Sequence, residues 1–527
     1  MTSTRLILLV SAFLLLASCT PQVQQTDLTV NITADGNNQS VTLTSGSTVQ
    51  QALDSAQVTL SQTDRVEPPT FTKITAGMVI LVTRVAEQFE TQQVIIPYER
   101  QELHNESLPS GDTRLVQAGQ NGLREVTVRH VYENGIETGS SVVSETILQD
   151  AVPEIVMIGV LSPFAPVPIP GKLAYLTAGN AWVMVDSTSN RYPLVTTGDL
   201  DGRIFSLSPD GKWLLFSRKS SLPPDQETNT LWVVSTSQSS PAPIDLKVSN
   251  VPNFAAWQPG TEYVISYSTV EPRATAPGWQ ANNDLNFLKF VNGTPTRPYK
   301  VLETNAGGIY GWWGMSFAWS PDGLNLAYSR PDGIGLVDIQ GADLISLLNI
   351  TPLNTHKDWA WVPGINWCPD NSSLYLVTHA APGGLVSPEE SPNFDLAAIS
   401  PADNIGTTLV QQTGMFASPS ASSLRSTDSD ATYLVAFLQA IFPTQSATSR
   451  YQLDVMNKDG TNLRSIFPGQ GRAGLEPQTP VWAPHPLETG GDYIAVFYEG
   501  NLWIIDLASG KTQQVTGDGL TSKIDWK

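Results

Sequence analysis

The chain has 527 residues and is acidic, because 49 Asp and Glu outnumber 29 Lys and Arg and give a net charge of −20 at pH 7. This length exceeds one domain of usual size, so we expect at least two units. The excess of acidic side chains argues against a nucleic-acid partner and against a polybasic membrane-binding patch. All 14 Trp lie at or after Trp182, which divides the chain into two regions of different composition.

The first residues predict an export signal. Arg5 is followed by an apolar run, residues 6–16, that is too short to span a bilayer. The run ends in Leu16-Ala-Ser-Cys19, which resembles the lipobox of bacterial lipoproteins. The resemblance implies that the signal peptide, residues 1–18, is removed and that Cys19 carries acyl chains such as palmitate. The alternative is an ordinary secretory signal with an incidental cysteine.

A lipid on Cys19 implies an extracytoplasmic protein that is attached to the cell membrane by this anchor only, with residues 19–27 as a polar tether. The only other cysteine, Cys368, then has no partner for an internal disulfide. Other copies of the pattern around Cys368 carry Ser, Gln or Ala at its position. We therefore expect Cys368 to be buried and unreactive.

Residues 28–85 predict a small α+β domain. Alternating strands at 28–32 and 41–44 precede Ser47-Thr-Val-Gln50, which has the form of a helix capping box. The domain resembles the ubiquitin-like domain found beside the peptidoglycan-acting part of resuscitation-promoting factors, in the segments 45–53, 64–66 and 74–84.

Residues 86–160 predict a β-rich domain. Residues 125–132 alternate, which places Val126, Val128 and His130 on one side of a strand. Asn134-Gly135 then predicts a tight hairpin turn, because both residues accept a positive φ. The domain resembles the five-glycine (G-five) domain in the segments Val94-Ile-Ile-Pro-Tyr98, Leu108-Pro-Ser-Gly111, Val116-Gln-Ala-Gly119, Tyr132-Glu-Asn-Gly135 and Val156-Met-Ile-Gly159.

The G-five resemblance implies a stalk at the cell surface that contacts peptidoglycan or another cell-wall glycan containing N-acetylglucosamine. The alternative is a passive spacer between the membrane and the next domain. We expect His130 to be a satisfied side chain on a half-buried face rather than a ligand-binding group.

After a linker at 161–171, residues 172–527 contain an internal repeat. A short pattern ending in Pro and a turn recurs, as in Ala318-Trp-Ser-Pro-Asp-Gly323, and is followed by further β-runs. Four strands per copy predict the blade of a β-propeller. The pattern resembles the propeller repeat of the periplasmic TolB protein and its relatives, a WD-like architecture. The prolines of the copies are Pro209, Pro259, Pro321, Pro369, Pro419 and Pro484.

The two ends of this region predict one more blade. Strands at 172–176, 181–185 and 192–195 have no first strand before them, and the chain ends in a first strand at 523–526 with nothing after it. Pairing these segments closes the ring and removes exposed sheet edges. We expect a mainly β protein with a seven-bladed propeller; six and eight blades are the alternatives.

Long insertions are expected on the face opposite the Ser-Pro-Asp-Gly turns, and we expect the face of these turns to be plain. Loops on a rigid scaffold usually carry binding sites. Aromatic side chains in the long loops are candidate ligand-binding residues, because flat rings suit sugars or apolar partner side chains. The alternative is that they only pack the loops onto the ring. The candidates are Trp279, Tyr310, Trp312, Trp313, Trp359 and Trp361.

The sequence contains no hydrolase nucleophile motif, zinc-protease motif or phosphate-binding loop, and its 5 His lack the spacing of metal ligands. We expect no enzymatic activity, metal or cofactor. The sequence predicts a lipid-anchored binding or scaffold protein whose stalk contacts wall glycan and whose propeller face binds a protein or a carbohydrate. The alternatives are a glycan-degrading or glycan-modifying enzyme that uses the same face, and a purely structural spacer.

Overall fold

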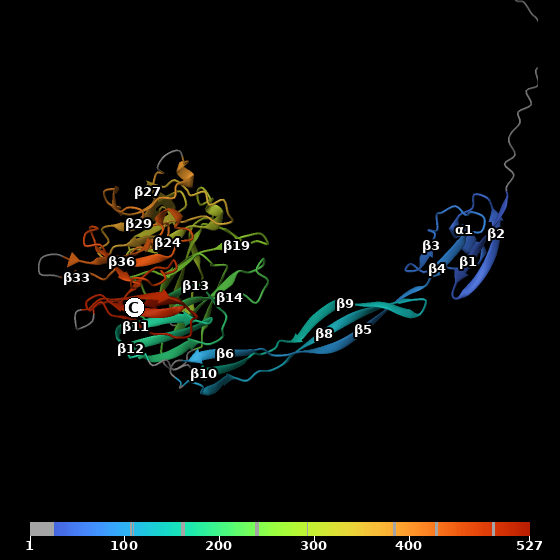
Figure 1. Ribbon diagram of the computed structural model, residues 1–527, viewed down its shortest axis with the longest axis horizontal. Coiled ribbons are helices and arrows are strands. Elements are labelled where there is room, and N and C mark those ends of the chain that lie inside the picture. Colours follow the sequence, from blue (N-terminus) through green and yellow to red (C-terminus); the bar gives the residue numbers. More distant parts are fainter. Residues whose placement is uncertain are drawn as a thin grey trace, which may run out of the picture. The chain divides into compact units, whose positions relative to one another are not determined.

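The computed structural model describes residues 26–105, 108, 110–159, 164–237, 242–291, 293–382, 386–426, 431–486 and 491–527. The predicted signal peptide, the anchor Cys19 and most of the predicted tether lie outside these residues. The described chain forms two compact units, one made of residues up to Arg100 together with Gln117–Glu154, the other of Gln101–Val116 and Ile155–Lys527. Strands dominate both units (Figure 1).

The first unit begins with a small sheet and a helix. Strands β1 (Asp27–Ala34) and β2 (Asn37–Thr44) form a hairpin, and β1 pairs in parallel with β4 (Val79–Thr83), which pairs with β3 (Arg65–Glu67). Helix α1 (Val49–Ser55) buries Val49 and Leu53 against this sheet. The capping box is present one residue later than predicted, because Thr48 is the N-cap and Gln51 its partner.

A three-stranded antiparallel sheet completes the first unit. Its strands are β5 (Val85–Ile96), β8 (Gly122–Glu133) and β9 (Ile136–Gln149), in the order β5-β8-β9. The predicted turn joins β8 to β9, with φ of 52° at Asn134 and 81° at Gly135. Every described residue of β9 is exposed, so this sheet is a single layer with solvent on both faces.

The remaining strands of the predicted G-five segment belong to the second unit. Strands β6 (Arg100–Asn105), β10 (Glu154–Gly159) and β7 (Thr113–Gln117) form a small sheet. Ile155 and Met157 of β10 are buried in the same core as Leu173 and Trp182. The structure also differs from the predicted linker at 161–171, because a strand begins within these residues at Pro168.

The rest of the second unit, which we call the seven-sheet region (residues 168–527), follows the predicted repeat. Its first sheet contains β12 (Asn180–Val195), β11 (Pro168–Thr177) and the C-terminal β42 (Thr521–Trp526). The predicted pairing of the two ends is present, with Leu173 opposite Trp526 and Leu176 opposite Lys523. The separate strand predicted at 192–195 is instead the end of the long β12.

Six further antiparallel sheets follow in chain order, each with four principal strands. The second and third contain β13 (Leu200–Leu207), β14 (Trp213–Lys219), β15 (Asn229–Ser235) and β16 (Ile244–Ser249), then β17 (Phe254–Trp257), β18 (Val264–Ser268), β21 (Leu285–Val291) and β23 (Tyr299–Leu302). The fourth and fifth contain β24 (Ser316–Trp319), β25 (Leu326–Arg330), β26 (Gly333–Asp338) and β27 (Asp343–Asn349), then β28 (Ile365–Trp367), β29 (Leu374–His379), β30 (Phe394–Ser400) and β31 (Ile405–Val410). The last two contain β32 (Ser420–Ala421), β35 (Leu434–Ala440), β36 (Tyr451–Asn457) and β37 (Arg464–Phe467), then β38 (Val481–Trp482), β39 (Tyr493–Tyr498), β40 (Asn501–Asp506) and β41 (Thr512–Gln514).

The first strands of all seven sheets surround one central cavity of about 600 Å³. Tryptophans at the end of these strands connect neighbouring sheets: the indole of Trp257 donates to the Ser206 carbonyl at 3.2 Å, and that of Trp367 to the Ala318 carbonyl at 2.9 Å. The cavity lies on the side of the Ser-Pro-Asp-Gly turns, since Pro209 and Pro321 line it. The prediction of a plain face on this side is therefore wrong.

The repeated turns are stabilised by a hydroxyl and a carboxylate. Ser208 donates to Asp210 at 2.6 Å and accepts from the Trp213 amide at 3.0 Å. Burial opposes ionisation of Asp210, but hydrogen bonds from Ser208, Tyr263 and Lys212 outweigh it and hold the pKa of this carboxyl below its usual range. The same pair of groups stabilises the turn at Ser320, whose hydroxyl donates to Asp322 at 2.5 Å.

One predicted copy of the turn is wrong. Pro419 was expected after a first strand, but it precedes the first strand β32 of its sheet. Ser422 takes the position of the turn serine instead, since its hydroxyl accepts from the Leu434 amide at 3.0 Å. An insertion that contains the strand pair β33 (Arg425–Ser426) and β34 (Ala431–Thr432) separates these two residues and hides the pattern in the sequence.

Candidate functional site

Five of the six predicted aromatic residues lie in loops of the seven-sheet region, and the sixth, Trp279, lies in a short strand. The segment between β23 and β24 contains the short helix η1 (Gly311–Trp313). Tyr310 precedes it with a φ of 61°, and the buried Asn283 amide fixes the turn by donating to the Gly311 carbonyl at 2.9 Å. A side chain on Gly311 would overlap the Ala306 carbonyl, so only glycine fits there. This scaffold holds Tyr310 and Trp313 edge to face, with ring centroids 6.3 Å apart.

Trp313 and Trp359 line a shallow hollow of about 210 Å³ together with Tyr310. The Trp313 indole donates to the Asp358 carbonyl at 3.2 Å, which fixes the ring against the segment between β27 and β28. A second hollow, of about 240 Å³, shares Leu353, Asn354, Thr355, Lys357 and Trp359 with the first. Trp359 therefore lines two adjoining hollows, and we call them together the Trp359 groove.

Polar groups surround the Trp359 groove. His356 Nε2 lies 3.1 Å from Glu390 Oε1, and both side chains are exposed. The second hollow is closed by Gln445 and Thr448 from the loop between β35 and β36. Aromatic surfaces beside hydroxyl, amide and carboxylate groups fit a carbohydrate or a polar peptide segment.

Trp279 and Trp312 each contact an arginine. Trp279 begins β20 (Trp279–Ala281), which pairs with β19 (Val270–Pro272), and the Arg203 guanidinium lies 4.6 Å from its ring centroid. The Arg273 guanidinium lies 6.0 Å from the ring of Trp312. Neither tryptophan lines the Trp359 groove, so the structure does not bring the six predicted residues into one site.

Trp361 lies in the hydrophobic core, with 2% of its surface exposed. Its indole donates to the Met415 carbonyl at 2.9 Å and its ring packs on Phe394. Trp361 therefore packs its loop onto the sheets. This is the alternative to ligand binding that the sequence analysis left open.

His379 also positions the loops around the groove. Its two ring nitrogens each lie 2.8 Å from a carbonyl oxygen, Nδ1 from Thr351 and Nε2 from Ser391. The ring stacks on Phe394 with centroids 4.9 Å apart. His379 thus ties the segment after β27 to the loop between β29 and β30.

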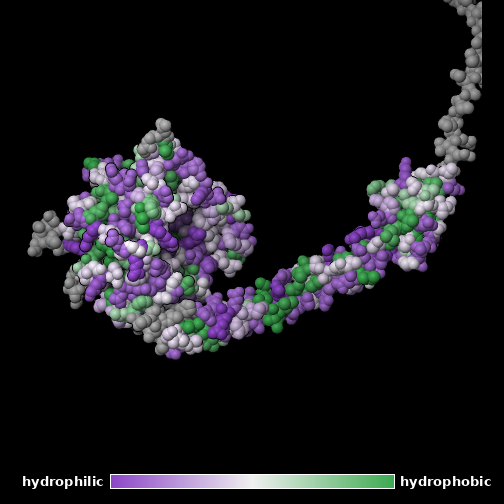
Figure 2. Space-filling model, viewed as in Figure 1, coloured by the Kyte–Doolittle hydropathy of each residue, from purple (hydrophilic) through white to green (hydrophobic). Residues whose placement is uncertain are grey.

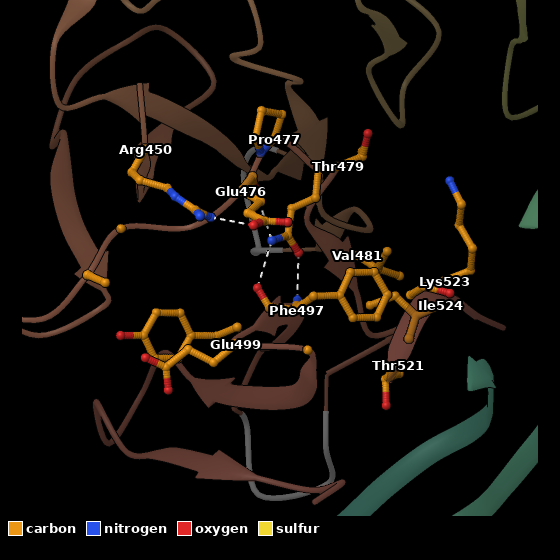
Figure 3. A pocket seen from close by; sticks show the side chains of 16 residues that line it. Arg450, Glu476, Pro477, Thr479, Val481, Phe497, Glu499, Thr521, Lys523 and Ile524 are labelled. Atoms are coloured by element: carbon orange, nitrogen blue, oxygen red, sulfur yellow. Dashed lines mark hydrogen bonds and ion pairs between the residues drawn. The ribbon is translucent and has the colours of Figure 1, made fainter. Parts of the chain in front are cut away.

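A further cavity of the seven-sheet region is one that the sequence did not predict. It has a volume of about 820 Å³ and lies between the segment before β38, the turn between β39 and β40, and the start of β42 (Figure 3). Arg450 and Glu476 form an ion pair of 2.6 Å on one side, and Lys523 lies on the other.

The single-layer sheet of the first unit is a second exposed surface. Strand register places Phe89 and Ile95 on one face and Val142 and Ile147 on the other. All four side chains are exposed, Phe89 by 62% and Ile95 by 61%, and Figure 2 shows apolar residues along this segment. The predicted face of Val126, Val128 and His130 is confirmed, and His130 Nδ1 lies 2.7 Å from Glu137 Oε1.

The residues that the structure describes include no group of three or more His, Cys, Asp or Glu side chains placed to bind a metal ion. Within the same residues, none of the helices has the length and apolar character needed to cross a membrane.

Two family models match the first part of the chain. The G5 domain matches residues 87–160, and the G5-linked ubiquitin-like domain matches residues 30–70. The predictions of a G-five domain at 86–160 and of a ubiquitin-like domain at 28–85 are confirmed for these residues.

Two curated relatives are similar over the same part. Resuscitation-promoting factor Rpf2 of Corynebacterium glutamicum is 26% identical over 150 residues, which cover 28% of this chain and 40% of the relative. Resuscitation-promoting factor RpfB of Mycolicibacterium smegmatis is 26% identical over 125 residues, 24% of this chain and 34% of the relative. The chain thus spans well under half the length of either relative.

Several solved structures are similar to parts of the chain. The G5 domain of HP0197 is 21% identical and covers 14% of this chain and 99% of its own, with a TM-score of 0.14. TolB from Acinetobacter baumannii is 12% identical and covers 83% and 99%, with a TM-score of 0.35. A prolyl endopeptidase is 14% identical and covers 69% and 50%, with a TM-score of 0.42.

Proposed function

We propose that the protein is an extracytoplasmic binding protein, held at the cell membrane by a lipid on Cys19, that contacts cell-wall glycan through the sheet β5-β8-β9. The observation that carries this proposal is the single-layer sheet with apolar side chains exposed on both faces, inside the residues matched by the G5 domain. The two curated relatives, both named resuscitation-promoting factors, support a place in the cell envelope. The role is binding rather than catalysis.

The exposed apolar side chains favour contact with a partner over a passive spacer. A spacer needs only polar surface, and exposed apolar groups gain free energy when a partner covers them. Phe89 supplies a flat ring for a sugar face, and the cross-strand neighbour Arg129 supplies hydrogen-bond donors beside it. An aromatic ring beside a charged donor suits a polysaccharide strand that carries apolar and hydroxyl faces.

For the second unit we propose a seven-bladed propeller that presents the Trp359 groove to a protein or carbohydrate partner. The shared central cavity and the pairing of β11 with β42 support seven blades closed by both ends of the region. A rigid ring with loop insertions is a common platform for binding.

Retention on insoluble peptidoglycan tests the glycan contact. In the purified chain spanning residues 20–527, we expect Phe89→Ser combined with Ile95→Ser to reduce retention at least fivefold. Phe71→Ser is the matched control, because Phe71 is 81% exposed but lies in the ubiquitin-like part. Deletion of residues 86–160 is a poor substitute, since it removes strands of the second unit as well. Equal retention of the double variant and the control would show that the sheet is a spacer.

The anchor is tested separately. We expect radiolabelled palmitate to enter the protein in its native host and Cys19→Ala to abolish this incorporation. Labelling that persists in Cys19→Ala would refute the anchor without affecting the glycan contact.

A further inference from the structure

The Trp359 groove consists of two adjoining hollows of similar size, about 210 and 240 Å³, and Trp359 lines both. Each hollow has the size of a single sugar ring. A stable protein interface instead buries roughly 1,200–2,000 Å² of surface in total. The groove therefore matches a short chain of rings better than the surface of a protein.

Trp359 offers an aromatic ring and an unpaired donor to the groove. Its indole N–H has no hydrogen-bond partner among the described residues, whereas the indole of Trp361, two residues later, donates to the Met415 carbonyl. The side-chain amide of Gln445, which is exposed and lines the second hollow, is likewise unpaired in the described part of the chain. A bound ligand can therefore form hydrogen bonds here without breaking any that exist.

The charged groups around the groove have both signs. His356 lines the first hollow and Glu390 the second, and their side chains lie 3.1 Å apart. Lys357 lines both hollows, and its neighbour Asp358 lines the first. Neither Lys357 nor Asp358 has an ion-pair partner within the described residues. One free ammonium next to one free carboxylate selects neither an anion nor a cation, so the groove fits an uncharged ligand.

The first hollow is held in shape by two residues with an unusual backbone. Tyr310 has a φ of 61° and His356 a φ of 53°, which residues other than glycine rarely adopt. Such conformations persist only where the surrounding structure fixes them. At His356 the backbone amide donates to the Asn354 side chain at 3.1 Å. The rings are thus positioned before a ligand arrives, which lowers the entropy cost of binding.

We propose that the Trp359 groove binds an uncharged disaccharide of N-acetylated sugars, with one ring in each hollow and a sugar face on Trp359. The inference rests on the function proposed for the groove and narrows its partner to this class of carbohydrate. An acetamido group fits the second hollow, because its methyl group suits the apolar lining and its amide can pair with Gln445. The apolar lining includes Leu353, Pro392 and Met415.

Calorimetric titration of the purified chain spanning residues 20–527 tests the proposal with three uncharged ligands. These are N,N′-diacetylchitobiose, cellobiose, which lacks the acetamido groups, and acetyl-tetraalanine amide, a peptide. We expect diacetylchitobiose to bind at least fivefold more tightly than cellobiose, and the peptide not to bind.

Variants assign the binding to the groove. Trp359→Ala should weaken the binding of diacetylchitobiose at least tenfold, and Gln445→Ala at least threefold. Trp312→Ala is the matched control and should leave the affinity unchanged, because Trp312 is 39% exposed but lines neither hollow. Thermal unfolding checks that each variant is folded, and Gln445→Ala changes only an exposed side chain.

Several results would overturn the proposal. These are no binding of diacetylchitobiose, equal affinity for cellobiose, and an affinity that neither Trp359→Ala nor Gln445→Ala changes. Tighter binding of the peptide, lost in Trp359→Ala, would overturn the assignment to a sugar and leave the groove as a site for a protein partner.

Failure here is distinguishable from failure of the proposed glycan contact. Binding of diacetylchitobiose that survives Trp359→Ala but not Phe89→Ser combined with Ile95→Ser would assign the sugar to the sheet β5-β8-β9 and overturn only the groove. Binding lost in Trp359→Ala, with retention on peptidoglycan independent of Phe89, would contradict only the sheet contact.

Discussion

Asp454 is a buried carboxylate that no ion pair compensates in the described part of the chain. It lies in β36 with 7% of its surface exposed, and one of its oxygens has no hydrogen-bond partner. Burial raises the pKa of Asp454 to about 6, although a hydrogen bond from Ser465 opposes the shift. Because the folded-state pKa lies above the unfolded one, the stability from this group is full below about pH 4 and is lost as the pH rises through 6.

We therefore expect Asp454→Asn to stabilise the protein at pH 7.5, by about 1 to 3 kcal/mol, and to have little effect at pH 4. Thermal unfolding followed by tryptophan fluorescence between pH 4 and 8 measures the difference. Asp459→Asn is the control, since this exposed carboxylate lies in the adjoining turn and hydrogen bonds from Thr461 lower its pKa. A gain in stability that does not depend on pH would contradict the role given to burial of the charge.

Cys368 occupies the position of the turn serine in its sheet. Its thiol donates to Asp370 at 2.8 Å and accepts from the Ser373 amide at 2.9 Å, as Ser208 does in the second sheet. Burial raises the pKa of the thiol, which disfavours the reactive thiolate. The prediction that Cys368 is buried is confirmed. It could be made from the sequence because residues at the same position of a repeat share one environment.

We expect Cys368→Ser to leave the unfolding midpoint nearly unchanged and Cys368→Ala to lower stability by about 1 to 2 kcal/mol, since alanine leaves the Ser373 amide unpaired. Chemical denaturation monitored by tryptophan fluorescence compares the two. Equal loss in both variants would mean that packing of the sulfur, not the hydrogen bonds, matters at this position.

At the scale of elements, Arg84 and Asp64 fix the junction between β4 and β5. The Arg84 guanidinium contacts Asp64 and Asp35, each at 2.7 Å, and Asp64 accepts from the Val85 amide at 3.1 Å. Burial disfavours the Asp64 carboxylate, but hydrogen bonds from Ser61 and Arg84 outweigh burial and hold its pKa well below the usual range. This stabilisation is complete above about pH 4 and is lost as the pH falls further.

We expect Asp64→Asn to destabilise this junction by about 3 kcal/mol, because it leaves Arg84 with one partner fewer in a partly buried site. Hydrogen exchange of the Arg84 and Val85 amides at pH 7 measures the stability of the junction between β4 and β5. Glu133→Gln is the control, since the pair of Glu133 with Arg65 is more exposed. Equal exchange rates in Asp64→Asn and the control would contradict the assignment.

Most strands were predictable from the sequence, and the exceptions have local causes. Apolar alternation located β1, predicted at 28–32, and β42, predicted at 523–526, to within two residues. The prediction of a separate strand at 192–195 is wrong, because β12 continues through Asp186, which has a φ of 59°, and ends only at Val195. The prediction of a turn at Pro419 is wrong, because an insertion separates the turn serine, Ser422, from Leu434, whose amide it accepts from.

The candidate site was less predictable, because it depends on which loops meet in space. Loop position identified Trp313 and Trp359, which do share a groove, but Trp361 lies two residues away in the core. The sequence alone gives no direction for a side chain in an irregular loop. The cavity beside Lys523 lies between the segment before β38 and the strand β42, and the sequence does not show that these two segments meet.

On the scale of the whole molecule, the C-terminal strand β42 contacts both the first and the second sheet of the seven-sheet region. Trp526 in β42 is 2% exposed, and its indole donates to the Pro170 carbonyl at 2.6 Å. The same strand reaches the second sheet, where Asp525 accepts from the Leu207 amide at 2.7 Å. β42 therefore connects the first sheet, through its pairing with β11, to β13 of the second sheet.

We expect Trp526→Ala to destabilise the seven-sheet region by about 3 to 5 kcal/mol, because it leaves a large cavity at the point of closure. All 14 Trp lie at or after Trp182, so tryptophan fluorescence reports on this region alone. Hydrogen exchange in β5, β8 and β9 should not change, since these strands belong to the other compact unit. Trp312→Ala, which removes an exposed ring, is the control and should cost less than 1 kcal/mol. If Trp526→Ala unfolds no more easily than this control, closure by the C-terminal strand does not stabilise the region.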